Sequence, residues 1–369
     1  MKRIVLVGGG SGGHFYPLIA VAEQLRSAED VDLIYMGPNE YDPEVLRDTN
    51  IRFVSCPAGK QRKYRSILNF FDAFKVLGGI IVAVYKLYTL YPDVIFSKGG
   101  YTSVPITIAG FLLRIPIVIH ESDTKPGSAN KLASRFARYI AISFAETDSF
   151  FAKEKTALTG IPLRNSFTQT IANPLGVLGL PSNKPLLFIT GGSGGAQRLN
   201  DLALESLDEL LPAFTVLHQT GSANAQNVEA SAASLITDSS LLESYFVKGS
   251  LTGVEMNAAM TAAALIVSRA GSGTIFEIAQ KGKPSIIVPI PEEVSHDQKT
   301  NAYTYARSGA CSVIEEHNFT DGLLASEITR IIGDENLYRT MATSALNFRK
   351  ESAARTIATT LIGVANEHN

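Results

Sequence analysis

Residues able to accept protons lie where predicted strands end in this sequence. His14 follows the glycine run Gly9–Gly13, where a helix is predicted to begin. A helix N-terminus disfavours a cationic imidazole, so we predict that His14 is neutral and able to act as a general base. A histidine that only caps or packs is the alternative, and the spacing alone favours that alternative.

A second segment, residues 265–277, combines an apolar run, the turn Gly271–Gly273 and a helical pattern from Thr274. Such a helix N-terminus presents free N–H groups and a partial positive charge, which suit a phosphate group. Glu277 would then chelate the two ribose hydroxyls of a nucleotide. Thr274 and Glu277 also have the spacing of a capping box, in which Glu277 only caps its own helix, and the segment leaves both interpretations open.

Further polar groups follow two buried-type strands, residues 93–97 and 116–120. The first is followed by Gly99-Gly100-Tyr101 and the second by Glu121-Ser122-Asp123. Loops after the carboxyl ends of parallel strands are where α/β folds bind ligands, so these residues are candidates for a binding site. His120 ends its strand and is expected to be structural.

The composition indicates a soluble two-domain protein. The chain has 369 residues, 45% hydrophobic residues and a net charge of −2, which gives no general attraction to nucleic acid. Cys56 and Cys311 have no metal-site or disulfide spacing, which favours a reducing compartment. Met1-Lys2-Arg3 leads into a short strand rather than a signal peptide, so we expect the protein to stay in the cytoplasm.

The run Gly-Gly-Ser-Gly-Gly occurs twice, at residues 9–13 and 191–195, each time after an apolar strand. Each half continues with alternating strands and helices, which predicts two similar α/β domains with parallel sheets. Residues 173–184 have the composition of an interdomain linker. Residues 342–367 are predicted to form a terminal helix that packs back on the first domain.

Gly8, Gly10 and Gly13 satisfy the Gly-x-Gly-x-x-Gly pattern, which alone is a weak dinucleotide signal. The next predicted strand, residues 33–37, has no acid at its end, and Glu40 comes too late. We therefore discount NAD, and the glycines are predicted to let the backbone approach another ligand.

A basic cluster precedes an apolar helical pattern in residues 60–90. The basic residues are Lys60, Arg62, Lys63 and Arg65, and the apolar ones are Ile67, Phe70, Phe71, Phe74, Leu77, Ile81 and Tyr85. This pattern is typical of an interfacial contact with an anionic membrane surface. A core helix beside a solvated loop is the alternative, and Gly78-Gly79 argues against one long helix.

Several blocks, in this order, resemble the MurG family of bacterial transferases, which add N-acetylglucosamine to the lipid-linked peptidoglycan precursor. The blocks are Gly9–His14, Gly99–Tyr101, His120-Glu121, Gly160–Arg164, Gly191–Ser193, Arg269–Glu277 and His296–Ala302. The resemblance spans nearly the whole chain. It implies the α/β fold GT-B, with two Rossmann-like domains, and an inverting glycosyltransferase that makes lipid II from lipid I.

The resemblance also assigns sites and partners. It implies an acceptor- and membrane-binding domain at 1–164, a domain at 165–341 that binds UDP-N-acetylglucosamine, and a helical segment at 342–369. The residues implied to contact the nucleotide sugar are Arg164, Ser193, Ala270, Gly271, Ser272, Gly273, Thr274, Glu277 and Gln298. Those implied near the lipid-linked muramyl-peptide acceptor are Ser11, Gly12, Gly13, His14, Tyr101, Glu121 and Asp123. No metal or other cofactor is implied, and the protein would be peripheral at the cytoplasmic face of the cell membrane.

The chain departs from the family pattern in three places: the family has Gln-Asn where this chain has Ser122-Asp123, Gln at Gly194 and a neutral residue at Lys299. Asp123 could alter the acceptor contacts or supply a second base, and Lys299 could contact the diphosphate. His14 and Glu121 are the predicted catalytic residues, with the identity of the base open. A related transferase with another acceptor, a UDP-sugar epimerase and a non-catalytic nucleotide-binding protein remain alternatives.

Overall fold

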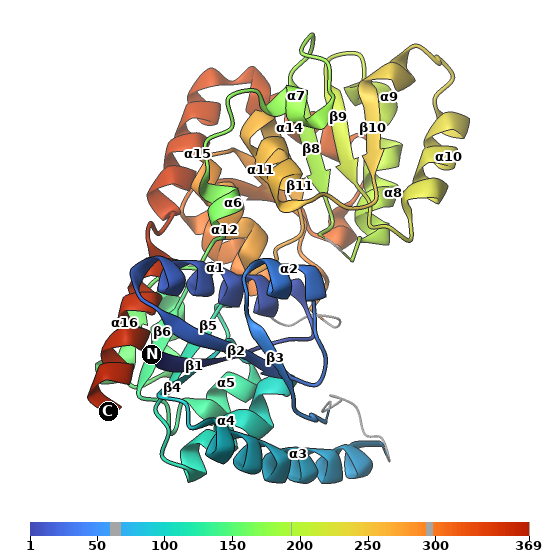
Figure 1. The fold of residues 1–369 in the computed structure, drawn as a ribbon. Helices are drawn as coiled ribbons and strands as arrows, with labels where there is room; N and C mark the ends of the chain where they lie inside the picture. Colours follow the sequence, from blue (N-terminus) through green and yellow to red (C-terminus); the bar gives the residue numbers. More distant parts are fainter. Residues whose placement is uncertain (60–67, 193, 293–297, 369) are drawn as a thin grey trace. The chain divides into compact units, whose positions relative to one another are not determined.

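The chain folds into two compact units, Met1–Asn165 with Lys350–Asn369, and Ser166–Arg349. The computed structural model describes residues 1–59, 68–192, 194–292 and 298–368 and, for residues 68–74, the backbone alone. Figure 1 gives the helix and strand labels that are used below.

The first unit contains a seven-stranded parallel sheet in the order β3-β2-β1-β4-β5-β6-β7. The strands are β1 (Lys2–Val7), β2 (Val31–Gly37), β3 (Arg52–Ser55), β4 (Val94–Ser97), β5 (Ile117–Glu121), β6 (Tyr139–Ile142) and β7 (Thr156–Leu158). Because β1, β4 and β5 are neighbours, the loops that follow their carboxyl ends meet at one edge of the sheet. The sequence prediction of buried parallel strands here is confirmed.

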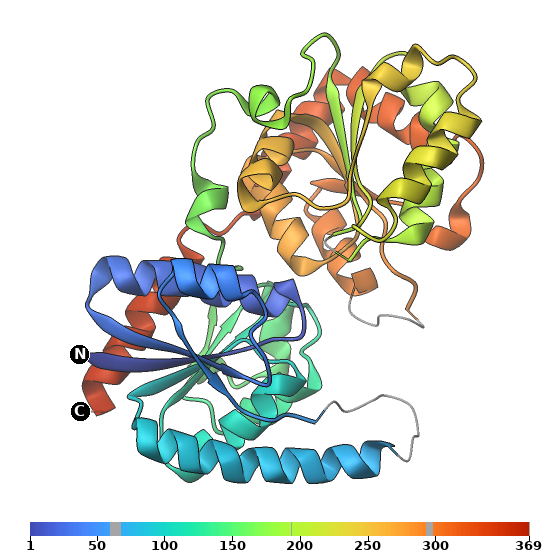
Figure 2. The ribbon, with the colours of Figure 1, turned by 45° about the vertical axis from the view of Figure 1, so that its right-hand side comes forward.

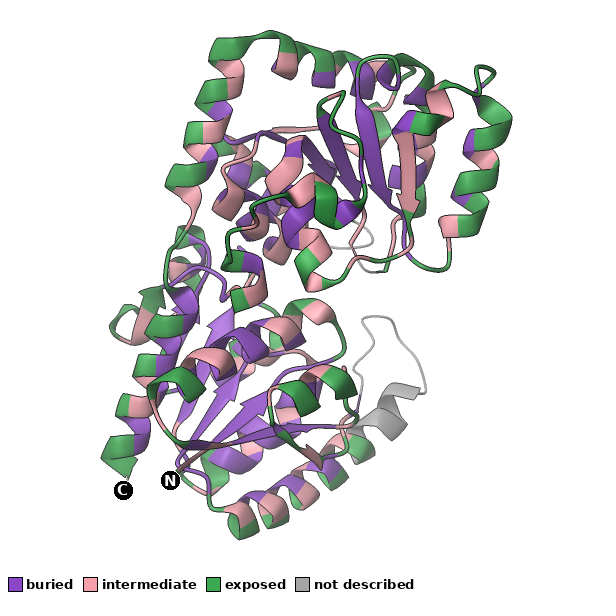
Figure 3. Cartoon of the chain, turned by 45° about the horizontal axis from the view of Figure 1, so that its top comes forward, coloured by how far each residue is buried: buried purple, intermediate pink, exposed green. Residues whose placement is uncertain are grey.

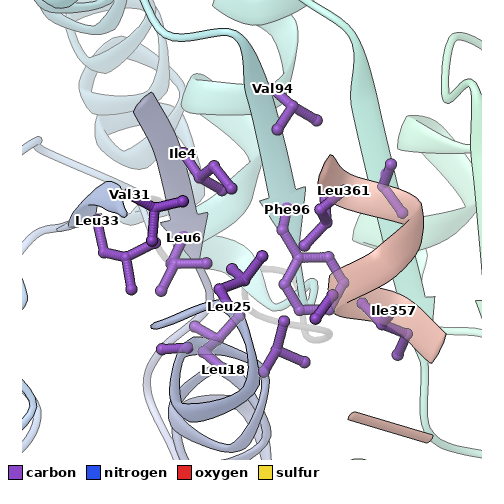
Figure 4. Close-up of a cluster of buried hydrophobic side chains, with 14 of the residues drawn as sticks. Ile4, Leu6, Leu18, Leu25, Val31, Leu33, Val94, Phe96, Ile357 and Leu361 are labelled. Carbon is purple, nitrogen blue, oxygen red and sulfur yellow. The ribbon is translucent and has the colours of Figure 1, made fainter. Parts of the chain in front are cut away.

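Helices cover both faces of this sheet, as expected when strands are apolar on both sides. The helices are α1 (Gly12–Ala28), α2 (Pro43–Asp48), α3 (Leu68–Leu90), α4 (Val104–Leu112), α5 (Ser128–Ala133) and α16 (Ala353–His368). Ile4, Leu6 and Phe96 point to the face that carries α1 and α16 (Figure 4). The alternate residues Val5 and Val7 point to the face that carries α3, α4 and α5.

The second unit contains a six-stranded parallel sheet in the order β10-β9-β8-β11-β12-β13. The strands are β8 (Leu186–Thr190), β9 (Thr215–Gln219), β10 (Tyr245–Lys248), β11 (Ala263–Ser268), β12 (Ser285–Ile287) and β13 (Cys311–Val313). The helices are α6 (Asn165–Thr168), α7 (Pro174–Leu178), α8 (Gln197–Glu205), α9 (Leu207–Leu210), α10 (Ala225–Leu235), α11 (Gly253–Ala262), α12 (Ser272–Lys281), α13 (Gln298–Arg307), α14 (Leu323–Gly333) and α15 (Glu335–Phe348). Strands β4 and β8, near the middle of the two sheets, are buried at every residue, and the central strands are mostly buried in Figure 3.

Two expectations about connections are wrong. Residues 173–184 are not a linker, because α7 lies within them and packs on α11 in the second unit. Residues 342–367 do not form one helix: α15 ends at Phe348, and a break with Ser352 at φ 67° precedes α16. The break divides the segment between the two units, α15 packing on α12 and α16 on α1.

The helix α3 is continuous, contrary to the expectation that Gly78-Gly79 would interrupt it. Its middle lies against the loop after β3: a Cβ at Gly79 would meet the carbonyl oxygen of Pro57 at 2.3 Å. Glycine is therefore needed at position 79 for the packing of the helix. In the view of Figure 2, α3 runs along the edge of the first unit beside α4.

Candidate active site

His14 lies in the first turn of α1, directly after β1 and the glycine loop. The helix is N-capped by Ser11, whose hydroxyl bonds to Nδ1 of His14 at 2.8 Å instead of capping a helix amide. When Nδ1 carries the proton and donates it to Ser11, Nε2 keeps its lone pair and can accept a proton. The second glycine loop differs, because Ala196 is the N-cap of α8 and lies outside the helix.

The surroundings of His14 disfavour its protonated form. Burial and the positive charge of Lys98 lower the pKa of His14 to about 4, and the carboxylate of Asp123 opposes this shift. The predicted neutral imidazole agrees with this direction, and burial and Lys98 add to the effect expected from the helix terminus. Nε2 lies beside the Gly99-Gly100 turn, since a Cβ at Gly100 would be 3.6 Å from it.

The loop after β4 contributes Lys98 and Tyr101 to the same edge of the sheet. Lys98 is 2% exposed, and its Nζ donates a hydrogen bond to Oγ of Ser122 in the loop after β5. Tyr101 lies against the glycine loop, since a Cβ at Gly10 would be 3.0 Å from its ring. Lys98 was missed by the sequence analysis, although a lysine between a buried strand and a glycine pair was a usable signal.

The carboxylate of Glu121 is buried and has four hydrogen-bond donors. The donors are the backbone N–H groups of Ser122 (2.8 Å), Asp123 (3.1 Å) and Gly127 (3.0 Å), and Nδ2 of Asn130 (3.0 Å). Burial and the charge of Asp123 raise the pKa of Glu121, and the hydrogen bonds from Asp123 and Asn130, together with the charge of Lys98, oppose the rise. The bonds fix the loop after β5, a task that occupies both carboxylate oxygens. A catalytic role for Glu121 stays a prediction, and the geometry favours His14 over it.

Two other predicted residues of the first unit have structural contacts. His120 is buried, and its Nε2 lies 2.8 Å from the carbonyl oxygen of Gly160, as expected of a structural histidine. The guanidinium of Arg164 lies over the ring of Tyr16, 4.1 Å from the ring centroid. This cation–π contact holds Arg164 beside α1, two residues along the helix from His14.

The second group of predicted residues lies around the N-terminus of α12. This helix begins at Ser272 with Gly271 as its N-cap and has no side-chain capping bond. Thr274 is therefore already the third residue of the helix, so the capping-box interpretation of Thr274 and Glu277 is wrong. Helix α11 provides the contrast, since Thr252 and Glu255 form a complete capping box there.

The N–H groups of Ser272, Gly273 and Thr274 have no helical acceptors, because a helix leaves the amides of its first turn unpaired. They are available to an anion, together with the positive end of the helix dipole. Glu277 is half-buried on the same helix, five residues or about 7.5 Å along the axis from Ser272. That separation is comparable to the one between the phosphates and the ribose of a nucleotide.

Arg269 and Asn301 brace the turn that precedes α12. Arg269 forms an ion pair with Glu316 at 2.5 Å and donates to the carbonyl oxygen of Val288 at 3.2 Å. Nδ2 of Asn301 donates to the carbonyl oxygen of Ala270 at 3.4 Å. These contacts link the ends of β11 and β12 to α13 and fix the position of the α12 N-terminus.

The other residues predicted to contact the nucleotide sugar lie in different surroundings. Gln298 is the first residue of α13, and its Oε1 accepts the N–H of Ile290 at 3.4 Å. The ammonium of Lys299, which was expected to contact a diphosphate, forms an ion pair with Glu315 at 2.9 Å instead. Ser193 and His296 lie outside the described residues.

Three histidines with lowered pKa values predict a loss of stability in acid. Burial lowers the pKa of His14 to about 4, that of His218 to about 3 and that of His120 well below 6.5. In the unfolded chain each imidazole binds its proton near pH 6.5, so below that pH protonation favours unfolding. We expect each of His14 and His218 to lower the unfolding free energy by about 2 kcal/mol between pH 7.5 and pH 5, and His120 to lower it further.

Urea unfolding at the two pH values measures this loss. A His218→Asn variant should show a smaller dependence on pH, whatever its absolute stability, because one of the three imidazoles is gone. An equal unfolding free energy of the parent protein at both pH values would contradict the prediction.

Two units, each with a parallel Rossmann-like sheet that carries a glycine loop and a helix N-terminus at its carboxyl edge, define the GT-B class of fold. Among the residues that the structure describes, no three His, Cys, Asp or Glu side chains are grouped to hold a metal ion. The model of the glycosyltransferase family 28 N-terminal domain matches residues 4–142, and that of the C-terminal domain matches residues 186–357.

The particular family follows from the relatives. A protein of Bacillus thuringiensis subsp. konkukian, named UDP-N-acetylglucosamine–N-acetylmuramyl-(pentapeptide) pyrophosphoryl-undecaprenol N-acetylglucosamine transferase 2, is 35% identical over 92% of this chain and 94% of its own. A Treponema denticola transferase with the same name, but without the final number, is 36% identical over 85% of this chain and 84% of its own. The chain belongs to this family of transferases, the MurG family.

Solved structures agree. Acinetobacter baumannii MurG is 26% identical and superposes with a TM-score of 0.75 over 98% of this chain and 100% of its own. The UDP-GlcNAc 2-epimerase of Neisseria meningitidis superposes with a TM-score of 0.70 over 98% of this chain and 100% of its own, but its sequence is only 14% identical. The likeness to the epimerase therefore concerns the fold alone.

Proposed function

We propose that the protein transfers N-acetylglucosamine from UDP-N-acetylglucosamine to a lipid-linked muramyl-pentapeptide, converting lipid I to lipid II with inversion at the anomeric carbon. The observation that carries this proposal is the 35% identity to a transferase of that name over 92% of this chain and 94% of the relative. Both domains of the relative are thus represented, rather than a shared nucleotide-binding domain alone.

The donor would bind to the second unit. The diphosphate would accept hydrogen bonds from the unpaired amides of Ser272, Gly273 and Thr274, and Glu277 would accept bonds from the ribose hydroxyls. Electrostatic stabilisation by helix N-termini lowers the barrier when charge develops on a leaving group. Here that group is UDP, whose bond to the sugar breaks. Arg164, whose guanidinium lies over the ring of Tyr16 on the first unit, would also contact the diphosphate.

The acceptor would bind to the first unit, at the loops after β1, β4 and β5. A hydroxyl of its muramyl sugar attacks the anomeric carbon as the bond to UDP breaks. Nε2 of His14 accepts the hydroxyl proton, which requires that Nδ1–H donates to Ser11. The low pKa of His14, about 4, leaves Nε2 free to accept a proton at neutral pH.

The direct test is incubation with UDP-N-acetylglucosamine and a lipid-linked muramyl-pentapeptide, with measurement of UDP and of the disaccharide lipid. Equal molar amounts of both products are expected, with none when the acceptor is omitted. An epimerase would instead convert the sugar nucleotide without an acceptor, as the fold likeness to the Neisseria meningitidis enzyme allows. Either acceptor-independent epimerisation or binding without turnover would refute the proposal.

The protein would act at the cytoplasmic face of the membrane, as a peripheral protein. Within the part of the chain that the structure describes, no helix could cross a bilayer. The buried face of α3 includes Ala83 and Leu87, whereas Leu77, Ile81 and Tyr85, predicted as part of one apolar face, are 56–68% exposed. The core-helix alternative is therefore wrong for these three residues.

The exposed α3 stripe, which we define as Leu77, Ile81, Tyr85 and Tyr88, supports a membrane contact. Phe111 and Leu112, on the neighbouring helix α4, are 55% and 60% exposed. Exposed apolar residues at helical spacing suit insertion into a bilayer interface. The basic cluster Lys60, Arg62, Lys63 and Arg65 precedes α3 but lies outside the described residues, as do the side chains of Phe70 and Phe71.

Replacing Ile81 and Tyr85 by serine should weaken binding to vesicles that contain anionic lipid by about 1.5–3 kcal/mol per side chain, the transfer energy of a buried large apolar group. Cosedimentation with vesicles at two salt concentrations measures the change. Because both residues are exposed, the melting temperature should stay close to that of the parent.

Leu235→Ser is a matched control, since Leu235 is 51% exposed and lies on the second unit. It should leave vesicle binding unchanged. Binding of the parent should also weaken as salt rises, if the basic cluster contributes. Unaltered binding of the double variant would rule out the α3 stripe as the contact surface.

A further inference from the structure

Lys98 is a buried ammonium group to which the proposed reaction assigns no task. Its side chain is 2% exposed directly after β4, between the loops that follow β1 and β5. A buried charge is costly unless it has partners, so its retention beside a candidate active site calls for a physical reason. Burial lowers the pKa of Lys98 to about 8, and the nearby carboxylates oppose this, so the group is still largely charged at pH 7.

Lys98 contacts both neighbouring loops. On one side, Lys98 packs closely on Gly8, because a Cβ added at Gly8 would be only 2.7 Å from Cβ of Lys98. Gly8 leads into the loop that carries His14. On the other side, its Nζ donates a hydrogen bond to Oγ of Ser122. The carboxylates of Glu121 and Asp123 interact with the ammonium electrostatically, and Glu121 is itself held by four hydrogen bonds.

The same charges act on His14. Lys98 disfavours the imidazolium, whereas Asp123 favours it. Tyr35 and Tyr101 also lie against the glycine loop. The hydroxyl of Tyr35 donates to the carbonyl oxygen of Gly8, and burial raises its pKa to about 12, so this phenol is uncharged when His14 titrates.

We propose that Lys98 is a positioning residue of the acceptor side, whose side chain packs on the strand end before the His14 loop and bonds to Ser122, and whose ammonium, with Asp123, sets the charge around the base. The positioning role rests on the proposed function, whereas the charge coupling to His14 does not. Asp123 provides a negative charge that partly compensates the ammonium of Lys98.

Lys98 and Asp123 carry opposite charges, so neutral substitutions at the two positions separate an electrostatic role from a structural one. In Lys98→Met the pKa of His14 should rise by about 1 unit, a usual size for the loss of a neighbouring charge. In Asp123→Asn the same pKa should fall. Loosening of the loops would instead expose His14 in both variants and move its pKa toward 6.5 in both.

The pKa of His14 is measured by NMR titration of the full chain with isotope-labelled histidine, and the His14 signal is assigned by its absence in His14→Gln. Lys2→Met is the matched control: it also removes one ammonium from the first unit, but Lys2 is paired with Glu29 at the amino end of β1. This control should leave the pKa of His14 unchanged. Lys98→Gln is the second variant if Lys98→Met does not fold.

The kinetic arm measures turnover of the lipid-linked acceptor against pH. In Lys98→Met the acid limb of the turnover number should move upward together with the pKa of His14. An unchanged pKa in the Lys98 variants, or shifts in the same direction in the Lys98 and Asp123 variants, would overturn the inference. A parent protein that transfers no sugar would refute the proposed function instead, and the NMR result would still decide the coupling.

Discussion

Replacing His14 by alanine is expected to lower the turnover number by about 100- to 10,000-fold, the usual contribution of a general base. The acceptor hydroxyl must lose its proton as the glycosidic bond forms, and Nε2 of His14 is the acceptor that the loops after β1 and β4 present. The affinity for UDP should hardly change, because His14 is not among the residues proposed to bind UDP, and all of those except Arg164 lie on the second unit. Steady-state kinetics at saturating acceptor, with calorimetric titration of UDP, measures both quantities.

The pH dependence gives an independent check on the same residue. Since the pKa of His14 is about 4, activity in the parent should stay level as the pH falls from 8 toward 5 and drop only below that. This acid limb should be missing from the residual activity of His14→Ala. A variant that keeps near-parental turnover at saturating acceptor would make His14 a packing residue, and Asp123 would then be the next candidate for the base.

Replacing Glu277 by alanine is expected to weaken UDP binding by about 1–3 kcal/mol, the cost of losing charge-assisted hydrogen bonds to the ribose. That corresponds to roughly 5- to 150-fold in the dissociation constant. The melting temperature should change little, because Glu277 lies beyond the first turn of α12 and does not cap the helix. Calorimetric titration with UDP measures the affinity, and thermal unfolding without ligand measures the stability.

Glu255→Ala is the matched control on the same unit. Glu255 belongs to the capping box of α11, and its removal should cost stability, by about 0.5–2 kcal/mol, without weakening UDP binding. If Glu277→Ala behaved like this control, with a lower melting temperature and an unchanged affinity, a ribose contact would be excluded.

The strands that form the two sheets could be predicted from the sequence, because strands buried on both faces require continuous apolar runs. Residues 4–7, 94–96 and 186–189 are such runs, and each is followed by glycines or by one or two polar residues and then glycines. The same local pattern identified the loops that carry His14, Asp123 and the α12 N-terminus. These are features of chain order and of backbone chemistry, which a sequence displays directly.

Helix boundaries and neighbours outside the local segment could not be predicted in this way. Whether Glu277 is a cap depends on a difference of three residues in the N-cap position of α12, because Gly271 and Thr274 are both acceptable N-cap residues in a sequence. The continuity of α3 through Gly78-Gly79 follows from the close contact of Gly79 with Pro57, which are 22 positions apart. The break before α16 likewise follows from packing against α1.

The sequence by itself determined the class of fold, the family blocks and the loops that hold the candidate site, because each rests on residues close together in the chain. Only the tertiary structure decided which groups set the charge in that site. Lys98, Glu121 and Asp123 reach His14 or one another because β1, β4 and β5 are adjacent in the sheet, and strand order is a long-range property. Burial then strengthens their interactions, since charges removed from water are screened less, and a lysine that looked ordinary in the sequence becomes a neighbour of the proposed base.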